Sequence, residues 1–298
     1  FAEVDESFNL DPEDIEKKIT ARTKAIMVVH LYGGPADIEK ILAVARRRKV
    51  RVLEDAAQSV GAQYKGRRLG SLGDIGIYSF QISKVITAGE GGAVVTNDPQ
   101  LFERAVRFHD LGELRPGHET LLGKPSMDWF PGVNYRMNEM TGGVMRAQLR
   151  KLDTIISLFR RNSQSVKEQI ESLPGLKLRG RPDPDGEIGL HVCPILKSKE
   201  LRDKFVEAMR AENVAASAPS GSPYLPAEPY IEKKAAPHAE WPSFTTPHGR
   251  AMRYGTACCP RTLDLRNRAA FVPIGAKYTE SDTRDIAAAI RKIHRALA

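Results

Sequence analysis

The sequence has few cysteines, and this shortage excludes one class of protein. Three cysteines occur among 298 residues, and two of them, Cys258 and Cys259, are adjacent. Three thiols make no disulfide framework of the kind that stabilises small secreted domains, and they favour a reducing, cytoplasmic location. We interpret the adjacent pair as two buried small side chains, with a redox pair as the alternative.

Signals for a membrane, for export and for a metal are also lacking. No apolar run approaches the ~20 residues that a membrane-spanning helix needs, so we expect no membrane contact. Residues 1–5 (FAEVD) contain no basic stretch followed by an apolar one, and no signal peptide is visible. His191, two residues before Cys193, offers only two of the four ligands of a zinc site, and we expect no metal.

Basic residues outnumber acidic ones, and the net charge of +8 raises nucleic acid as a partner. The basic residues are dispersed, however, and no interleaving with aromatic residues suggests base stacking. Residues 46–49 (RRRK) end a predicted helix, where positive charge suits the helix dipole. We expect no nucleic acid partner, and a phosphorylated small substrate remains compatible with the charge.

The order of the apolar segments predicts an α/β fold. A hydrophobic content of 41% with 28% charged residues is typical of a globular protein, and 298 residues suffice for one large or two ordinary domains. Residues 25–30 (AIMVVH) and 50–53 (VRVL) have the apolar character of buried parallel strands, and 37–48 has helical spacing. Strand, helix and strand over this length make a βαβ unit with a mostly parallel sheet.

Further elements are predicted along the rest of the chain. They are helices that start at 12 and cover 99–111, 138–173 with a break near Asp153, 198–212 and 281–297, a hairpin-like connector at 61–73, strands at 188–195 and 214–217, an irregular stretch at 112–133 and a proline-rich region at 219–247. From about residue 176 the pattern becomes α+β. The chain is therefore predicted to hold a large domain at 1–150 and a smaller C-terminal α+β domain at 151–298.

Three side chains with chemical potential, His30, Asp55 and Lys84, fall at or just past predicted strand ends. Ligands gather at the carboxyl ends of the strands in parallel sheets. A lysine amine can bond covalently to the aldehyde of pyridoxal phosphate (PLP), and a carboxylate can hold its pyridine nitrogen protonated. The alternatives are a solvated surface lysine, an aspartate that caps a helix or turn, and a satisfied core histidine.

Several segments of the chain resemble one family of enzymes. These segments are residues 54–58 (EDAAQ), 64–74 (YKGRRLGSLGD), 79–84 (SFQISK), 89–92 (GEGG), 9–12 (NLDP), 30–33 (HLYG), 134–137 (NYRM) and 272–274 (VPI). They are similar to the DegT/DnrJ/EryC1/StrS family, whose members are PLP-dependent aminotransferases acting on nucleotide-linked keto sugars or on keto-cyclitols. The resemblance spans nearly the whole chain. It implies PLP-transferase fold type I, the fold of aspartate aminotransferase, with PLP as the cofactor.

The resemblance also implies roles for five residues. Lys84 is the catalytic lysine, which binds the PLP aldehyde and moves a proton between the amino acid and the cofactor. Asp55 pairs with the pyridine nitrogen, Gln58 lies at the phenolic oxygen, and Ser79 binds the phosphate. Asn134 reaches the phosphate of a neighbouring subunit, which implies a homodimer with shared active sites.

The residue at position 84 bears on the type of reaction. Relatives that dehydrate sugars have histidine where this chain has Lys84, so the resemblance favours amino transfer. Gln81 and the GEGG sequence at 89–92 are similar to cyclitol-type members such as glutamine:scyllo-inosose aminotransferases. Glutamate or glutamine is the expected amino donor, and nucleotide sugar, polysaccharide or antibiotic biosynthesis is the expected context.

The chain departs from the family pattern at its front. Members usually have about a hundred more residues before the position that corresponds to Phe1, and without them sheet edges and apolar faces would be left open. The chain is therefore expected to be a fragment of a longer protein or a truncated product that binds PLP poorly. A non-catalytic relative with a regulatory or interaction role is the alternative.

Overall fold

The computed structural model consists of two compact units. It describes residues 1–123, 125–219, 224–238 and 242–297. One unit, here called the sheet unit, contains Ile19–Arg160 and Arg181–Gly189. The other, the C-terminal unit, contains Phe1–Lys18, Arg161–Gly180 and the residues from Leu190 onward.

The boundary between the two compact units lies later in the chain than the predicted domain boundary at residue 150. The change occurs at residue 160, inside helix α6 (Leu152–Glu168), and the first 18 residues belong to the C-terminal unit. A compact unit is a set of segments in mutual contact, whereas a domain could fold alone. The division into domains 1–150 and 151–298 therefore stays a prediction.

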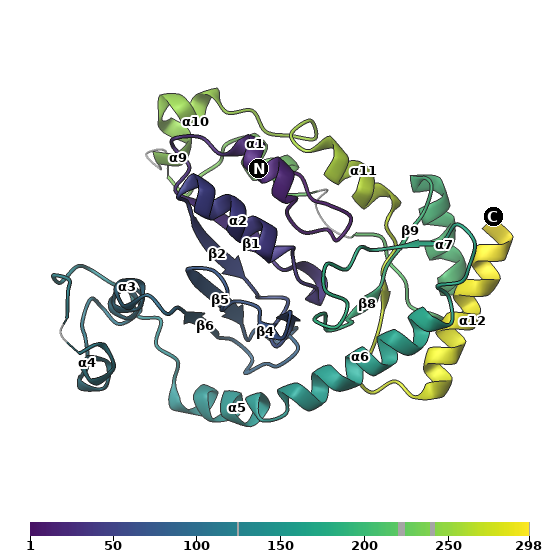
Figure 1. Ribbon diagram of the computed structural model, residues 1–298, viewed down its shortest axis with the longest axis horizontal. Coiled ribbons are helices and arrows are strands. Elements are labelled where there is room, and N and C mark those ends of the chain that lie inside the picture. Colours follow the sequence, from purple (N-terminus) through teal and green to yellow (C-terminus); the bar gives the residue numbers. More distant parts are fainter. Residues whose placement is uncertain (124, 220–223, 239–241, 298) are drawn as a thin grey trace. The chain divides into compact units, whose positions relative to one another are not determined.

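A four-stranded sheet forms the centre of the sheet unit (Figure 1). Its strands lie in the order β1 (Ala25–Val29), β2 (Arg51–Asp55), β5 (Ile75–Ser79) and β6 (Gly92–Val95). β1, β2 and β5 are parallel to one another, and β6 is antiparallel to β5. The predicted mostly parallel sheet is thereby confirmed.

Helix α2 (Ile38–Arg48) makes the crossover from β1 to β2, as the βαβ pattern predicted, and packs against β2 (Figure 1). Asp37 caps its first turn by accepting the N–H of Lys40 at 3.4 Å. Ile38 and Ile41 are fully buried on its inner side. Arginines in the last turn complement the negative end of the helix dipole.

The two faces of the sheet differ in burial, because successive side chains of a strand point to opposite faces. On the covered face, Val52 and Glu54 are buried. On the opposite face, here called the open face, Met27 and Val94 are 56% and 52% exposed. The strand register places Asp55, the last residue of β2, on this open face.

The remaining elements of the sheet unit are a hairpin and helices. They are η1 (Leu31–Gly33), β3 (Gln63–Tyr64), β4 (Arg67–Arg68), α3 (Pro99–His109), α4 (Pro116–Leu122), α5 (Glu139–Leu149) and the first part of α6. The hairpin of β3 and β4 confirms the connector predicted at 61–73. The helix predicted at 138–173 is α5 followed by α6, with the break at residues 150–151.

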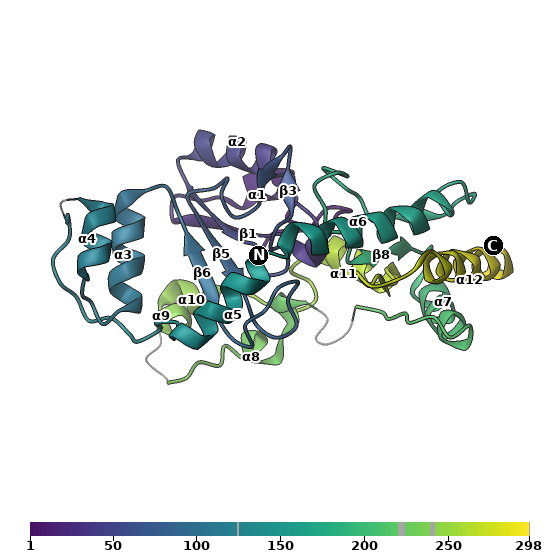
Figure 2. The same cartoon turned by 90° about the horizontal axis from the view of Figure 1, so that it is seen from below.

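Helix α4 corrects the sequence prediction of an irregular stretch at 112–133. It packs beside α3 (Figure 2). The prediction treated Pro116 and Gly117 as helix breakers. Proline is tolerated at the first position of a helix, however, because that residue has no intrahelical acceptor for its N–H.

The C-terminal unit contains short strands and helices. They are α1 (Pro12–Lys18), β7 (Lys177–Leu178), β8 (His191–Val192), β9 (Pro194–Ile195), α7 (Lys199–Ala211), η2 (Leu225–Ala227), α8 (Pro229–Glu232), α9 (Pro242–Thr245), α10 (Pro247–Ala251), α11 (Pro260–Arg268), β10 (Val272–Pro273) and α12 (Glu280–Leu297). None of the helices within the described ranges is both long and apolar enough to cross a bilayer.

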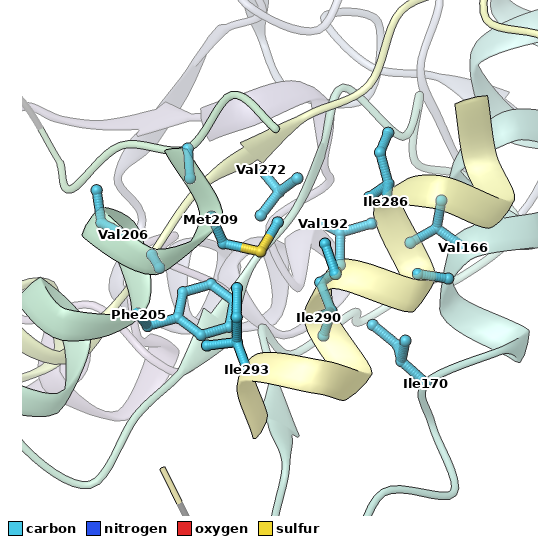
Figure 3. Packing of buried hydrophobic residues seen from close by; sticks show 14 of the residues in the cluster. Val166, Ile170, Val192, Phe205, Val206, Met209, Val272, Ile286, Ile290 and Ile293 are labelled. Carbon is cyan, nitrogen blue, oxygen red and sulfur yellow. The ribbon is translucent and has the colours of Figure 1, made fainter. Parts of the chain in front are cut away.

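The core of the C-terminal unit lies between α7, α12 and the end of α6 (Figure 3). Phe205 and Met209 of α7 contact the apolar side of α12, which presents Ile286, Ile290 and Ile293. These isoleucines recur every three or four residues, as an amphipathic helix requires. The terminal helix predicted at 281–297 is thereby confirmed.

Two strand predictions in this unit were too long. The strand predicted at 188–195 is two short strands, β8 and β9, which pair with different partners. The strand predicted at 214–217 is a single bridge between Ser217 and Phe271. Parts of the proline-rich region predicted at 219–247 lie outside the described residues.

His191 of β8 makes the stability of this unit depend on pH. Its ring packs edge-on against Phe271, with the centroids 5.6 Å apart. Burial, helped by the nearby cation of Arg179, lowers the pKa of His191 from 6.5 to about 4. Between these two values the unfolded chain binds more protons than the folded one, so stability rises with pH across this window.

We therefore expect the free energy of unfolding to fall by about 2 kcal/mol between pH 7 and pH 5 through His191 alone. Urea unfolding at the two pH values measures it. The His191→Gln variant should lose this part of the pH dependence, whereas the exposed His248 serves as the control, because His248→Gln should retain it. An unchanged pH dependence in His191→Gln would contradict the assignment.

Candidate active site

Two of the predicted site residues end neighbouring parallel strands. Asp55 is the last residue of β2 and Ser79 the last residue of β5. Asp55 pairs in register with Ile77, so Ser79, two residues further on, lies on the same open face. Parallel strands are about 4.8 Å apart, which places the two side chains close together at the carboxyl edge of the sheet. Asp55 Oδ1 accepts the N–H of Ala57 at 2.9 Å.

Lys84 lies in the connection between β5 and β6, on the same edge of the sheet. Its N–H donates to the carbonyl of Gln81 at 2.9 Å and closes a turn. Two anchors fix this connection: the side chain of Ile86 is fully buried, and the N–H of Phe80 donates to the carbonyl of Gly91 at 2.9 Å. The lysine is half-buried and starts five residues after the end of the strand that carries Ser79.

Gln58 connects this edge to the turn after β1. Its Oε1 accepts the N–H of Tyr32 at 3.1 Å. The hydroxyl of the adjacent Ser59 donates to the carbonyl of His30 at 2.5 Å. The segment that follows Asp55 is therefore bonded to the segment that follows β1, and Gln58 lies with Asp55 and Ser79 at the carboxyl edge.

Asn134 lies apart from the other four predicted residues in sequence and in its contacts. Its backbone bridges Asp110 at the end of α3, and its exposed side chain accepts the N–H of Arg136 at 3.4 Å. Asp110 in turn is buried and accepts hydrogen bonds from the guanidinium groups of Arg115 and Arg136. These two arginines, Arg115 above all, hold the pKa of Asp110 well below its ordinary value, although burial acts in the opposite direction.

The DegT/DnrJ/EryC1/StrS aminotransferase family matches residues 1–291 of the chain. The chain belongs to this family. The α/β fold of PLP-transferase type I that the sequence predicted is confirmed by the same comparison and by the solved structures that the chain resembles.

Relatives within the DegT/DnrJ/EryC1/StrS family are enzymes whose names refer to a sugar or to a cyclitol. The chain is 42% identical over 170 residues to GDP-perosamine synthase of Escherichia coli O157:H7, a match that covers 56% of the chain and 44% of that enzyme. It is 33% identical to L-glutamine:2-deoxy-scyllo-inosose aminotransferase of Streptoalloteichus tenebrarius, over 96% of the chain and 68% of the relative. The chain thus spans less than half of the first relative and about two thirds of the second.

A solved structure resembles the chain over nearly its whole length. The structure is S. venezuelae DesV in complex with a ketimine intermediate, with a TM-score of 0.76 and 28% identity. The similarity covers 98% of this chain and 71% of DesV.

The groups at the carboxyl edge fit a phosphorylated pyridine aldehyde. Lys84 offers an amine for the aldehyde, Asp55 a carboxylate for the ring nitrogen, and Ser79 a hydroxyl for the phosphate. Asp55 and Ser79 share one face, and the connection that carries Lys84 continues from the strand of Ser79.

Sequence reasoning left Glu54 without a role and left His30 undecided. Both side chains are fully buried, and His30 Nε2 lies 2.9 Å from Glu54 Oε2. His30 is thus the satisfied core histidine of the alternative interpretation. The available signal was the position of Glu54 between Val52 and Ala56, which are buried on the same face of the strand, because an acid in such a place needs a partner.

Proposed function

We propose that the protein is a PLP-dependent aminotransferase. It transfers an amino group from glutamate or glutamine to a keto sugar linked to a nucleotide or to a keto-cyclitol. The placement of Asp55 and Ser79 on one face, beside the connection that carries Lys84, supports this proposal most directly. The names of the sugar and cyclitol relatives support the acceptor class.

Three residues would hold PLP, which supplies an electron-accepting ring when it is bound. The Asp55 carboxylate would accept a hydrogen bond from the protonated pyridine nitrogen and keep that proton in place. The Ser79 hydroxyl would donate to a phosphate oxygen. The amide NH₂ of Gln58 would donate to the phenolic oxygen, while its Oε1 accepts the N–H of Tyr32.

Lys84 would move the proton that amino transfer requires. As a neutral amine it would take a proton from the α-carbon of the donor amino acid and give a proton back at the C4′ carbon of the cofactor. The anchored ends of its connection leave the butyl chain of the lysine as the part that swings between the two carbon atoms. Between turnovers the same amine would hold the cofactor by condensing with its aldehyde, whose oxygen leaves as water.

We propose further that two copies form a dimer with shared sites. Apolar side chains project from α5 and from the segment before it, with Met140 83% exposed and Tyr135 72% exposed. Met137, Val144 and Leu149 of the same stretch are also exposed, and exposed apolar side chains that gather in one region are typical of interaction surfaces. Asn134 lies in this region, so it would serve the phosphate site of the partner subunit.

A charge within this region should weaken the dimer. We expect Met140→Asp to raise the dissociation constant at least tenfold, because it would bury an unpaired carboxylate at the interface. Sedimentation velocity over a concentration series measures this. Leu121→Asp is the matched control, since Leu121 is 75% exposed but lies on α4. A monomeric wild type at all concentrations would overturn the dimer.

One assay tests the proposed function as a whole. The protein with PLP is incubated with glutamate or glutamine and with a panel of nucleotide-linked 3-keto and 4-keto hexoses and keto-cyclitols. Mass spectrometry then follows the exchange of a keto oxygen for an amino group in the acceptor. Turnover of one acceptor supports the proposal and identifies the substrate. PLP binding without transfer to any acceptor would contradict it.

We also propose that the protein works in the cytoplasm, where such sugar intermediates are made.

A further inference from the structure

A fully buried acid directly precedes Asp55 in strand β2. Glu54 lies on the covered face of the sheet, whereas Asp55 lies on the open face. The carboxylate of Glu54 accepts hydrogen bonds from the N–H groups of Leu72 and Gly73, each at 2.6 Å, from the N–H of Gly70 at 2.9 Å, and from His30 Nε2 at 2.9 Å. These four donors match the roughly four lone pairs that the two oxygens of a carboxylate present.

His30 is buried as completely and is held through both ring nitrogens. Its Nδ1 accepts the N–H of Ala36 at 3.1 Å, so the ring proton lies on Nε2 and is donated to Glu54. The imidazole thus connects the backbone of the turn after β1 to a carboxylate in β2. Burial raises the pKa of Glu54, but its hydrogen bonds from His30, Gly73 and Gly70 outweigh that effect and lower the pKa below its ordinary value.

The loop that binds Glu54 is packed closely against the sheet. The carbonyl of Gly70 lies against Gly76 of β5, where a Cβ atom would be 1.9 Å from the carbonyl oxygen. The hydroxyl of Tyr78 donates to the carbonyl of Leu69 at 2.6 Å. Glu54 is therefore bonded to a fixed loop, and this loop holds β2 in place.

Two parts of the candidate active site are attached to this pair. The N–H of His30 donates to the carbonyl of Asp55 at 2.9 Å. The turn that begins at His30 carries Tyr32, whose N–H donates to Oε1 of Gln58 at 3.1 Å. A displacement of the imidazole would therefore be passed to the backbone of Asp55 and to the side chain of Gln58.

We propose that Glu54 and His30 form a positioning pair that orients Asp55 and Gln58 on the open face. A buried carboxylate with a full set of donors stabilises a fold less than an apolar side chain would, so anchoring is the role that this position serves. Both side chains are fully buried, and Glu54 lies on the face of the sheet opposite Asp55. The importance of the pair for catalysis rests on the proposed function, whereas its effect on the geometry does not.

Two substitutions of His30 distinguish the hydrogen bond at Nε2 from the hydrogen bond at Nδ1. His30→Gln keeps a donor nitrogen where Nε2 lies and so keeps the bond to Glu54. His30→Asn is shorter and loses that donor, although its oxygen can still accept the N–H of Ala36. Glu54→Gln removes the charge and replaces one acceptor oxygen by a donor. Comparison of these variants isolates the His30–Glu54 contact from the volume of the side chain.

Hydrogen exchange of the full chain without added PLP gives the first readout. We expect the amides of Ala57 and Tyr32, which donate to Asp55 Oδ1 and Gln58 Oε1, to exchange roughly tenfold faster in His30→Asn and Glu54→Gln. In His30→Gln the rates should stay within about twofold of the wild type. Glu3→Gln is the matched control: it alters a buried acid that binds backbone amides in the C-terminal unit, and the two amides should not respond.

PLP binding and kinetics give the second readout. In His30→Asn we expect PLP to bind roughly tenfold more weakly and kcat to fall by a similar factor, with KM for the amino acceptor little changed. His30→Gln should recover most of both values. A merely structural role would lower the melting temperature and leave kcat and PLP affinity of the folded molecules unchanged.

The outcomes distinguish this inference from the proposed function. Wild-type exchange at Ala57 and Tyr32 in folded His30→Asn overturns the positioning pair, whether or not the protein binds PLP. Faster exchange at both amides in a protein that never binds PLP supports the pair and overturns the proposed function. If Glu54→Gln does not fold, the contrast between the two His30 variants decides the question.

Discussion

Replacing Lys84 by alanine is expected to lower the rate of amino transfer by roughly 10⁴-fold, because the variant lacks the amine that would move the proton. The variant should also lose covalent capture of PLP. Borohydride reduction of the wild type with PLP should leave a pyridoxyl group on the peptide that contains Lys84, and mass spectrometry of a digest detects it. Rate and capture should disappear together, since one nitrogen atom serves both.

The control for this experiment is another lysine of the sheet unit. Lys65 follows a strand of the β3–β4 hairpin, is exposed, and pairs with Glu39. Lys65→Ala should keep the wild-type rate and the wild-type capture. A pyridoxyl group that persists on the protein after Lys84→Ala would show that another lysine binds the cofactor, and the assignment of Lys84 would be wrong.

Substitution of Asp55 by asparagine is expected to lower kcat roughly 10²–10³-fold. The amide keeps the shape of the side chain and an oxygen for the N–H of Ala57, so the fold should survive. It cannot keep the pyridine nitrogen protonated, and the ring then accepts electrons poorly. Steady-state kinetics at saturating PLP measures the effect, and a circular dichroism spectrum checks that the variant is folded.

Asp98→Asn provides the comparison for Asp55. Asp98 caps α3 by accepting the N–H groups of Gln100 and Leu101 at 2.9 and 3.2 Å, and it lies in the same unit. Its substitution should cost about 1 kcal/mol of stability at most and leave kcat unchanged. Equal losses of kcat in the two variants would mean that Asp55 acts only through stability.

The sequence predicted best where a single chain segment determines the outcome. Apolar runs predicted β1 and β2, and the spacing of Ile286, Ile290 and Ile293 predicted α12 almost to the residue. Helix α4 was missed because Pro116 can either end or begin a helix, and the decision depends on its packing against α3. The short strands of the C-terminal unit were extended too far, since their length is set by partners distant in sequence.

The candidate site shows the same division between local and distant information. Asp55 and Ser79 are the last residues of β2 and β5, and Lys84 lies five residues after β5. The apolar runs predicted Asp55 and Lys84 at or just past strand ends, whereas only the family resemblance singled out Ser79. The register that places Asp55 and Ser79 on one face is a property of the folded sheet. The hydrogen bond between His30 and Glu54 joins positions 24 residues apart. The apolar neighbours of Glu54 indicate that this acid needs a partner, but they do not indicate that the partner is His30.

The open face also makes the isolated polypeptide prone to aggregation. Met27 and Val94 project from β1 and β6, the outermost strands of the described sheet. An outer strand offers unpaired amides and carbonyls to any other extended chain, and apolar side chains beside it strengthen such pairing. Insoluble deposits formed during overproduction or heating should therefore grow from these two strands, and the soluble yield will depend on what covers them.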